Sequence, residues 1–212
     1  MVNRKEISKA VLKRLPSYLN YLKGLSDQPN ISATALAAAL GMGEVQVRKD
    51  LAMVSNGGRP KVGYNRLALI DDIEQFLGYD NTTDAVLIGA GKLGQALLDY
   101  KGFDAYGLNI LAAFDAKPKA DQTESGKPIL PMEELEYFCH KNKVLMGIIT
   151  VPSEYAQEVA DRLVDCGIKA IWNFAPTLLE VPSHILVQYE NMATSLAVLS
   201  MHLQAHIKEE KK

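Results

Sequence analysis

Cysteine is scarce in these 212 residues, long apolar runs are missing, and the net charge is only −2. Two cysteines, Cys139 and Cys166, are too few for a disulfide framework or for a zinc site with four cysteine ligands. No apolar run reaches the ~20 residues that span a bilayer, which excludes a transmembrane helix. Residues 1–5 lead into no apolar signal core. We therefore expect a cytoplasmic protein without a membrane partner, of one large or two small globular domains.

The small net charge conceals an uneven distribution along the chain. Residues 1–66 carry 11 Lys and Arg against 4 Asp and Glu, a net charge of +7, whereas residues 67–212 carry 12 against 21, a net charge of −9. A basic front and an acidic back predict that only the front meets a polyanion. The alternative is a solvated basic face that has no partner.

The first basic segment has the spacing of an amphipathic helix. Within residues 5–23, apolar side chains recur at intervals of three and four residues, and the stripe comprises Ile7, Ala10, Val11, Leu15, Tyr18 and Leu22. Arg14 lies on the same stripe. A buried cation there requires a carboxylate or a backbone partner, and the alternative is an edge position from which the side chain reaches solvent.

Two short helices follow, joined by a glycine turn at residues 41–43. Ser32 is a suitable N-cap for a helix over 34–40, and a further helix is expected over 44–54. On the latter, Val47, Leu51 and Val54 face inward, leaving toward solvent Gln46, Arg48, Lys49 and Met53. Two helices with such a turn form a helix-turn-helix, and a polar, cationic outer face suits contact with phosphates and base edges.

A glycine-rich hairpin follows at residues 55–64, with Arg59 and Lys61 at its tip. A basic hairpin after a helix-turn-helix is typical of a wing, and its cations can enter the narrow minor groove of A·T-rich DNA. The alternative is a plain surface hairpin. A helix over 67–77 then closes a first domain, which we place at residues 1–79.

The second domain, residues 80–188, begins with the sequence G-x-G-x-x-G between a strand and a helix. The strand is residues 84–88, and the loop comprises Gly89, Ala90, Gly91, Lys92, Leu93 and Gly94. Gly89 permits a tight turn, Gly91 keeps the backbone clear for a pyrophosphate, and Gly94 allows close packing of helix on strand. The start of the helix supplies N–H groups to the phosphates.

The next strand, residues 108–114, ends in an acid. Asp115 can accept both hydroxyls of an adenosine ribose and would repel a 2′-phosphate, which favours NAD(H) over NADP. Lys117 and Lys119 stand close by and weaken that exclusion, since they could attract the extra phosphate of NADP or coenzyme A. An empty nucleotide fold is the remaining alternative.

Further strands and helices alternate along the chain and predict a parallel sheet with right-handed crossovers. We expect helices near 132–142 and over 153–166, and strands over 144–150 and 168–173. Val151 and Pro152 then fall at the carboxyl end of a strand, where such sheets bind ligands.

A last helix, about 190–207 within a segment that we place at 189–212, is apolar nearly all round. One domain can cover only part of such a helix, so a second subunit is expected to cover the rest in a symmetric homodimer.

The residue patterns that could form a catalytic or metal site are incomplete in this chain. Tyr137 and Lys141, with Ser125 before them, have the residue types of a short-chain dehydrogenase site, but those enzymes open with a different glycine pattern and more strands. His202 and His206 have metal-ligand spacing without an obvious third ligand. A cofactor site without a hydride-transfer acid or base predicts a sensor and not an enzyme, with no metal.

Taken together, the sequence resembles the Rex family of redox-sensing repressors over almost its whole length. The matching runs are residues 47–51, 62–64, 89–97, 114–115, 156–160 and 168–176. The resemblance implies a winged-helix domain, a Rossmann domain and a swapped C-terminal helix in a homodimer. NAD⁺ would permit binding to operator DNA, and NADH would release it.

By position, the resemblance also implies roles for single residues. DNA contacts would come from Gln46, Arg48, Lys49, Arg59, Lys61 and Tyr64. Tyr100 would help to report the state of the cofactor held by the glycine loop and Asp115. Arg14 stands where the family has an arginine that pairs with an aspartate of the C-terminal helix, and this chain has Asn191 at that aspartate's position.

The wing also departs from the family pattern, because Pro60 and Lys61 replace an Arg-Gly pair. These changes leave a second hypothesis open: a divergent relative that binds NAD or coenzyme A with altered or lost DNA binding.

Overall fold

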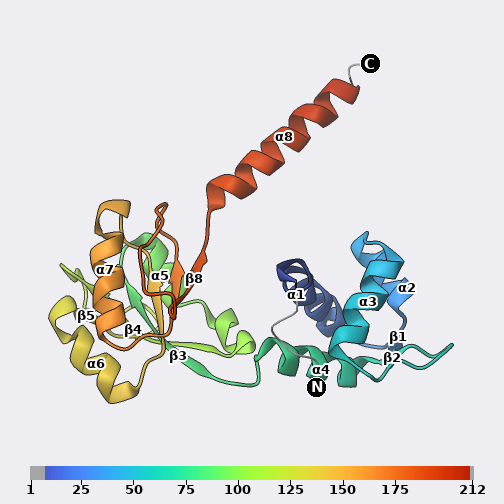
Figure 1. Ribbon diagram of the computed structural model, residues 1–212, viewed down its shortest axis with the longest axis horizontal. Coiled ribbons are helices and arrows are strands. Elements are labelled where there is room, and N and C mark those ends of the chain that lie inside the picture. The colour runs from blue at the N-terminus through green and yellow to red at the C-terminus, as the bar shows by residue number, and fades with distance from the viewer. Residues whose placement is uncertain (1–7, 211–212) are drawn as a thin grey trace. The chain divides into compact units, whose positions relative to one another are not determined.

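The computed structural model describes residues 8–210, apart from the side chain of Lys9. The chain divides into two compact units (Figure 1). One comprises the residues up to Asn81 together with Ala105–Gly107, and the other comprises Thr82–Asp104 and the residues from Leu108 onward.

The N-terminal unit is four helices with a two-stranded antiparallel sheet. Its elements are α1 (Lys9–Gly24), β1 (Asn30–Ile31), α2 (Ala33–Leu40), α3 (Glu44–Val54), β2 (Tyr64–Asn65) and α4 (Arg66–Leu77). Ser32 caps α2 as predicted, since its hydroxyl accepts the Ala35 N–H at 3.0 Å. The predicted helices over 34–40, 44–54 and 67–77 are confirmed to within one residue.

The core of this unit lies between the helices, where the side chains of Leu15, Leu19, Leu22, Leu36, Val47, Leu51, Leu69 and Ile73 are buried. The predicted stripe on the first helix is wrong at Ala10, which is exposed. Ala10 precedes Leu15 by five residues, which at about 100° per residue turns it well away from the buried face. Ile7 lies outside the described residues.

The C-terminal unit contains a six-stranded sheet of β3 (Thr83–Ile88), β4 (Leu108–Asp115), β5 (Ile129–Pro131), β6 (Met146–Ile149), β7 (Ala170–Asn173) and β8 (Leu186–Tyr189). The strand order is β5-β4-β3-β6-β7-β8, and every neighbouring pair is parallel. The predicted parallel sheet is confirmed, and this is the strand order of a Rossmann fold. From β3 the chain runs outward to β4 and β5, and it then crosses to the other side of β3 and runs outward through β6, β7 and β8. In sheets of this kind, ligands bind outside the carboxyl ends of the two strands at which the order reverses, here β3 and β6.

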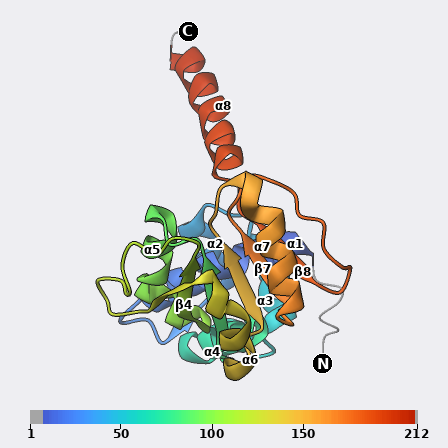
Figure 2. The same ribbon diagram turned by 90° about the vertical axis from the view of Figure 1, so that its left-hand side faces the viewer.

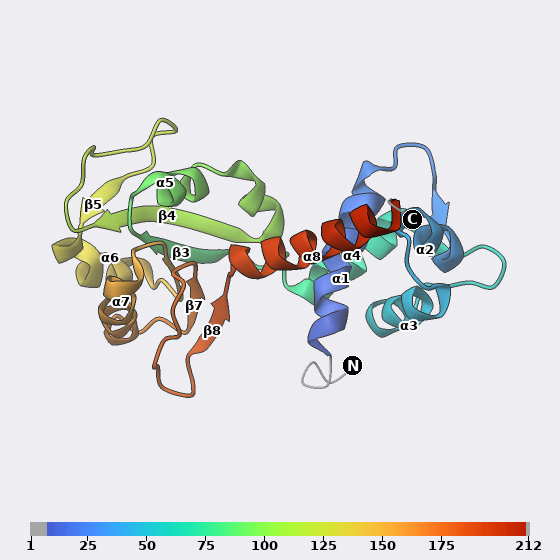
Figure 3. The same ribbon diagram turned by 90° about the horizontal axis from the view of Figure 1, so that it is seen from above.

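Helices cover both faces of this sheet. The covering helices are α5 (Lys92–Leu98), α6 (Leu135–Asn142) and α7 (Ser153–Asp165). The remaining helical elements are the 3₁₀ helices η2 (Lys101–Tyr106) and η3 (Met132–Glu134) and the C-terminal helix α8 (Met192–Glu210). Figure 3 shows α5 on one side of β3 and β4 and α6 and α7 on the other. Apolar strand residues alternate between two buried clusters, one under α5 and one under α6 and α7.

Two strands of the six-stranded sheet escaped the sequence analysis, and both lie at its edges, while the short pair of β1 with β2 in the N-terminal unit was also missed. β5 has three residues and ends in Pro131, and β8 has only half-buried and exposed residues. Edge strands are paired on one side only, so they need neither a long apolar run nor the absence of proline. Short length and weak patterning therefore made them indistinguishable from loops.

The C-terminal helix α8 follows β8 directly (Figure 2). All of its described residues are exposed within the single chain, including Leu196, Leu199, Leu203 and Ile207. Among residues 8–210 no helix is long and apolar enough to cross a membrane.

Candidate functional site

The glycine loop lies between β3 and α5, and two of its glycines leave no room for a side chain. A Cβ on Gly94 would lie 1.9 Å from the Gly89 carbonyl oxygen, and Gly89 itself has a φ of +103°. Gly91 differs, because a Cβ there would meet no atom within 4 Å. The loop is therefore closely packed at both ends and open in the middle, as a backbone that receives a pyrophosphate requires.

Hydrogen bonds hold the loop in place from three sides. The Gly89 N–H donates to the Phe114 carbonyl at 2.7 Å, and the Thr150 hydroxyl donates to the Gly89 carbonyl at 2.8 Å. The Gln95 side-chain amide donates to the Ala90 carbonyl at 2.8 Å. These contacts tie the loop to the ends of β4 and β6 and to α5, so it is preorganised for a ligand.

A cavity of about 480 Å³ opens beside this loop. Its lining brings together five residues that the sequence analysis selected: Gly89, Gly91, Asp115, Val151 and Pro152. Met132, Tyr155, Val159 and Arg162 line it too and were missed. Met132 follows the undetected strand β5, and the other three lie on α7, where helix periodicity alone does not show which residues border a ligand.

Asp115, at the end of β4, already accepts two backbone hydrogen bonds. One carboxylate oxygen accepts the Ala90 N–H at 2.8 Å and the other accepts the Lys117 N–H at 2.9 Å. A carboxylate has about four acceptor positions, so two remain for ribose hydroxyls. Asp115 thus fits its predicted partner and also fixes the loop that would bind the phosphates.

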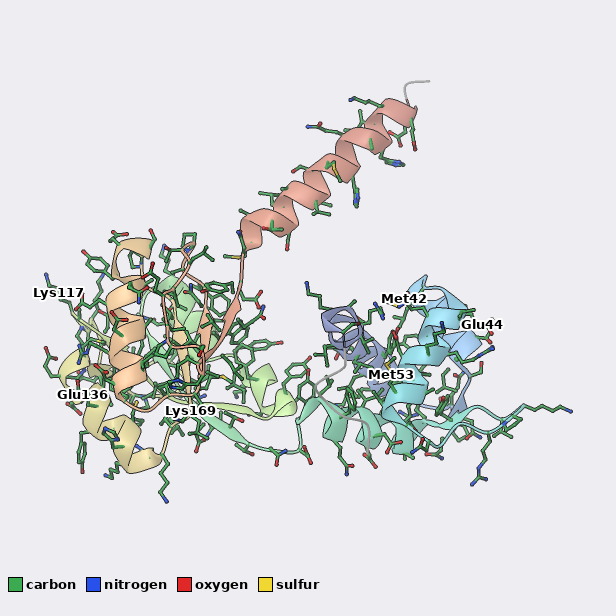
Figure 4. All side chains as sticks on the ribbon, viewed as in Figure 1. Met42, Glu44, Met53, Lys117, Glu136 and Lys169 are labelled. Atoms are coloured by element: carbon green, nitrogen blue, oxygen red, sulfur yellow. The ribbon has the colours of Figure 1, made fainter. Side chains whose placement is uncertain are left out.

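Lys117 and Lys119 do not line the cavity. Both are exposed on the segment after β4, and Figure 4 shows the Lys117 side chain pointing away from the sheet. Lys92 and Leu93 form the exposed first turn of α5. Tyr100 follows the last turn of the same helix, is 55% exposed and does not line this cavity.

A second candidate surface lies on the N-terminal unit, where α3 presents polar side chains to solvent. Gln46, Arg48, Lys49 and Met53 are exposed, as predicted. Figure 4 labels Glu44 and Met53 at the two ends of this helix. Arg48 forms an ion pair with Glu44 one turn earlier, so Lys49 is the cation on this face for which no ion pair occurs among the described residues.

The predicted hairpin is confirmed. Arg59 and Gly63 form an antiparallel bridge closed by two hydrogen bonds of 2.9 Å. Lys61 at the tip has a φ of +62°, a left-handed conformation that a lysine adopts at a cost. Gly63 has a φ of +85°, and a Cβ there would lie 2.4 Å from the Ile31 carbonyl oxygen, so this position requires glycine.

The start of α2, helix α3 and the hairpin enclose a hollow of about 490 Å³. Arg48, Arg59, Lys61 and Tyr64 line it together. The Tyr64 ring packs against Gly58, where a Cβ would lie 2.8 Å from the ring. Cations that are distant in the sequence thus converge on one concave surface, which suits a phosphate backbone.

Arg14 pairs with a carboxylate, as a cation on the buried face of α1 requires. Its guanidinium donates to both oxygens of Asp50, at 2.8 and 3.0 Å, and the Tyr18 hydroxyl donates to the same carboxylate at 2.8 Å. Asp50 is only 2% exposed and lies on α3 next to Lys49. The hydrogen bond to Asp50 raises the pKa of Arg14, and burial, followed by the hydrogen bond to Asp50, raises the pKa of Tyr18 to about 12.

Asn191 has a different partner. Its side-chain oxygen accepts the N–H groups of Ala193 and Thr194 at 3.0 and 3.2 Å, which caps the start of α8. Within residues 8–210 no three His, Cys, Asp or Glu residues gather in a group that could hold a metal ion.

Comparisons with known proteins agree with both surfaces. A family profile described as "Putative DNA-binding protein N-terminus" matches residues 6–52, and one described as "CoA binding domain" matches residues 80–177. The redox-sensing transcriptional repressor Rex of Treponema denticola is 42% identical over 204 residues, which are 95% of this chain and 97% of that protein. The Rex of Carboxydothermus hydrogenoformans is 40% identical over 206 residues, 94% and 97% of the two chains.

The chain belongs to the Rex family of redox-sensing transcriptional repressors. The solved structure of RSP, a Rex-family repressor, with β-NAD⁺ and operator DNA matches this chain with a TM-score of 0.87 at 36% identity, over 97% of this chain and 96% of that one. RSP with β-NADH matches with a TM-score of 0.83 at 35% identity, over 98% and 99%. The predicted winged-helix and Rossmann architecture of a Rex protein is therefore confirmed.

Family membership clarifies the unusual wing tip. Lys61 stands where the family pattern has glycine, and its left-handed backbone is the conformation that a glycine adopts there without cost. With Pro60 and Lys61 in place of an Arg-Gly pair, this Rex-family chain keeps the number of cations in the wing but moves one to a strained position at the tip.

Proposed function

We propose that this chain is a transcriptional repressor that binds operator DNA as a homodimer with NAD⁺ and releases the DNA when NADH replaces it. The observation that carries the proposal is the match over 97% of the chain to a Rex-family repressor bound to β-NAD⁺ and operator DNA. The glycine loop and the cationic hollow support the two halves of the proposal separately. We therefore expect this chain to act as a regulator and not as an enzyme.

For the cofactor, we propose that Gly89, Ala90 and Gly91 with the first turn of α5, Lys92, Leu93 and Gly94, receive the pyrophosphate. The open space at Gly91 supports this role. Asp115 would accept the ribose hydroxyls, and Val151 and Pro152 would form the apolar wall of the adenosine pocket. The position of Lys117 and Lys119 outside the cavity favours NAD(H) over coenzyme A and NADP, which need a cation for their extra phosphate.

For DNA, we propose that Gln46, Arg48 and Lys49 on α3 enter a major groove. Arg59, Lys61 and Tyr64 of the wing would reach the adjacent minor groove, which favours A·T-rich operators because their narrow minor groove concentrates negative potential. The ion pair between Arg48 and Glu44 leaves Lys49 as the principal phosphate-binding cation of α3.

We further propose that the C-terminal segment 189–212 is the dimerisation segment, and that its helix α8 covers apolar surface of a second copy. A helix of this length with an apolar, fully exposed stripe is stable in water only when another chain covers it. Arg14 and Asn191 are the proposed coupling residues between the two functions. Asn191 keeps hydrogen-bonding capacity without charge, so a contact between them would be weaker than an arginine–carboxylate pair.

Coupling requires that NADH binds the DNA-incompetent state more tightly than the DNA-competent state. Reduction adds a hydride to the nicotinamide and removes its positive charge, so the two forms differ where the cofactor reacts. A tenfold preference at one site corresponds to about 1.4 kcal/mol, and a dimer has two sites.

A gel shift on A·T-rich operator fragments tests the function, with NAD⁺, NADH and coenzyme A titrated separately. Release of DNA by NADH alone supports the repressor. If the protein binds DNA but none of the three ligands changes that binding, the proposed sensor function is contradicted. If no DNA is bound under any condition, a divergent nucleotide-binding relative is favoured. Coenzyme A is included in the titration because a CoA-binding profile matches residues 80–177.

A further inference from the structure

The segment after Tyr100 passes from one compact unit to the other and back. Residues up to Asp104 belong to the C-terminal unit, Ala105–Gly107 belong to the N-terminal unit, and the chain returns at Leu108. The two units are therefore joined by three stretches of backbone: the one after Asn81 and the two that flank residues 105–107.

The first half of this segment is packed into an aromatic cluster of the C-terminal unit. The Phe103 ring makes edge contacts with Tyr100, at a centroid distance of 4.9 Å, and with Trp172, at 5.6 Å. Trp172 in turn contacts Phe174 at 4.8 Å, beyond the carboxyl end of β7. A Cβ on Gly102 would lie 2.4 Å from the Tyr100 ring, so the backbone here is held close to that ring.

This half is also close in sequence to the proposed cofactor loop. Helix α5 has only seven residues, begins directly after Gly91 and ends at Leu98, two residues before Tyr100. Along the chain, only this short helix and Asp99 lie between the loop and Tyr100.

The second half is fixed within the N-terminal unit. The Tyr106 ring makes an edge contact with Tyr79 at 5.2 Å, and its hydroxyl donates to the side-chain oxygen of Asn20 on α1 at 3.4 Å. Gly107 has a φ of +69°, and a Cβ there would lie 2.6 Å from the Asn81 carbonyl oxygen. Residues 105–107 are thus anchored to α1 and to the end of the segment after α4.

The helix between these anchors carries aromatic residues at intervals of three. A 3₁₀ helix has three residues per turn, so side chains three apart eclipse one another. Phe103 and Tyr106 of η2, together with Tyr100 just before it, have this spacing.

We propose that η2 is a coupling element that carries the state of the cofactor loop to the N-terminal unit, with Phe103 and Tyr106 as its positioning residues. This inference rests on the proposed function. Neither ring lines the cofactor cavity or the cationic hollow, so their removal changes neither binding surface. It changes how strongly the two surfaces are linked.

Two leucine variants test the proposal on the full-length protein. Tyr106→Leu removes the ring contact to Tyr79 and the hydrogen bond to Asn20, and Phe103→Leu removes the contacts to Tyr100 and Trp172, while leucine preserves apolar bulk at both positions. Tyr137→Leu is the matched control, because Tyr137 is 70% exposed on α6 and far along the chain from η2. The measured quantity is the ratio of the operator dissociation constants with and without NADH, accompanied by calorimetry of NADH binding.

Each η2 variant is expected to lower this ratio at least threefold, while the NADH dissociation constant and the operator dissociation constant without cofactor each change less than twofold. The control keeps the wild-type ratio. An unchanged ratio in either η2 variant would overturn the inference, as would a change that merely follows weaker NADH binding. A wild-type protein that binds operator but ignores NADH would instead remove the proposed function, and the inference with it.

Discussion

Asp50 is one carboxylate with three hydrogen bonds, and it connects the exposed and buried faces of α3. Arg14 and Tyr18, both on α1, hold it from the interior, while Lys49, the preceding residue of the helix, faces solvent. A bidentate arginine contact fixes orientation as well as distance. At the scale of the residue, this contact fixes α3 against α1 and thereby sets how the exposed side chains of α3 are presented.

Replacing Asp50 with alanine should destabilise the N-terminal unit by about 3 kcal/mol, because the Arg14 guanidinium and the Tyr18 hydroxyl lose their shared acceptor. Arg14 is 21% exposed, which places the loss at the lower end of the range for a broken buried pair. Urea denaturation followed by circular dichroism measures the change. Glu44→Ala on the same helix removes only an exposed ion pair and should cost less than about 0.5 kcal/mol.

Two glycines of the cofactor loop should respond to substitution in opposite ways. Gly91→Val should leave the free energy of unfolding almost unchanged, because a Cβ at Gly91 meets no atom, yet it should abolish NADH binding by occupying the space for the pyrophosphate. Retention of NADH affinity by this variant would contradict the role of the loop. Calorimetry together with thermal unfolding separates the two effects.

Gly94→Ala is the complementary variant. Its Cβ would lie 1.9 Å from the Gly89 carbonyl oxygen, so α5 and the loop must separate. We expect a loss of about 3 kcal/mol of stability, within the range of severe backbone clashes, measured by thermal unfolding. A fully stable Gly94→Ala protein would show that the loop is looser than described.

At the scale of the element, α3 and the hairpin work as one cationic surface. Helix α3 offers Lys49, and the hairpin offers Arg59 and Lys61 on a strained tip. The contribution of Lys49 should be independent of DNA sequence, because phosphate contacts carry no base information. Arg59 and Lys61 should instead favour A·T-rich duplexes, whose narrow minor groove concentrates negative potential.

Lys49→Ala should therefore weaken binding to all duplexes and reduce the slope of log affinity against log salt by about 0.9. Fluorescence anisotropy at several salt concentrations gives this slope. Lys169→Ala is the control, since Lys169 is also an exposed lysine but belongs to the C-terminal unit. An identical slope for wild type and Lys49→Ala would exclude Lys49 from the interface.

At the scale of the whole molecule, every described residue of α8 is exposed. Leu196, Leu199, Leu203 and Ile207 recur at intervals of three and four residues along it, and all are exposed. An amphipathic stripe of this length is expected to be buried in the assembled protein.

Leu199→Glu should weaken self-association at least about a hundredfold, because it places an unpaired carboxylate in an apolar contact. Sedimentation velocity measures the shift from dimer to monomer. Gln204→Glu adds the same charge to a polar position of the helix and should leave the dimer intact. If Leu199→Glu sediments like the wild type, α8 is not part of the interface.

Much of this protein was predictable because its signals are local. The glycine spacing at 89–94, the acid at 115 and the cap at Ser32 are properties of a few consecutive residues, and helix periodicity placed 44–54 correctly. The sequence resemblance to Rex proteins depended on the same short runs. These local patterns predict structure reliably because the backbone conformation that they require is determined mainly by neighbouring residues.

The rest depended on contacts between distant residues. Arg14 lies 36 residues from Asp50, and sequence periodicity required a partner for it without identifying which carboxylate. The edge strands β5 and β8 exist only because β4 and β7 offer unpaired edges. The assignment of residues 105–107 to the N-terminal unit follows from the packing of Tyr106 and Gly107, which no local pattern encodes. Local chemistry in the sequence thus determined which groups could bind a dinucleotide and a polyanion, whereas tertiary packing decided which side chains hold those groups in place, because partner choice is a property of three-dimensional proximity.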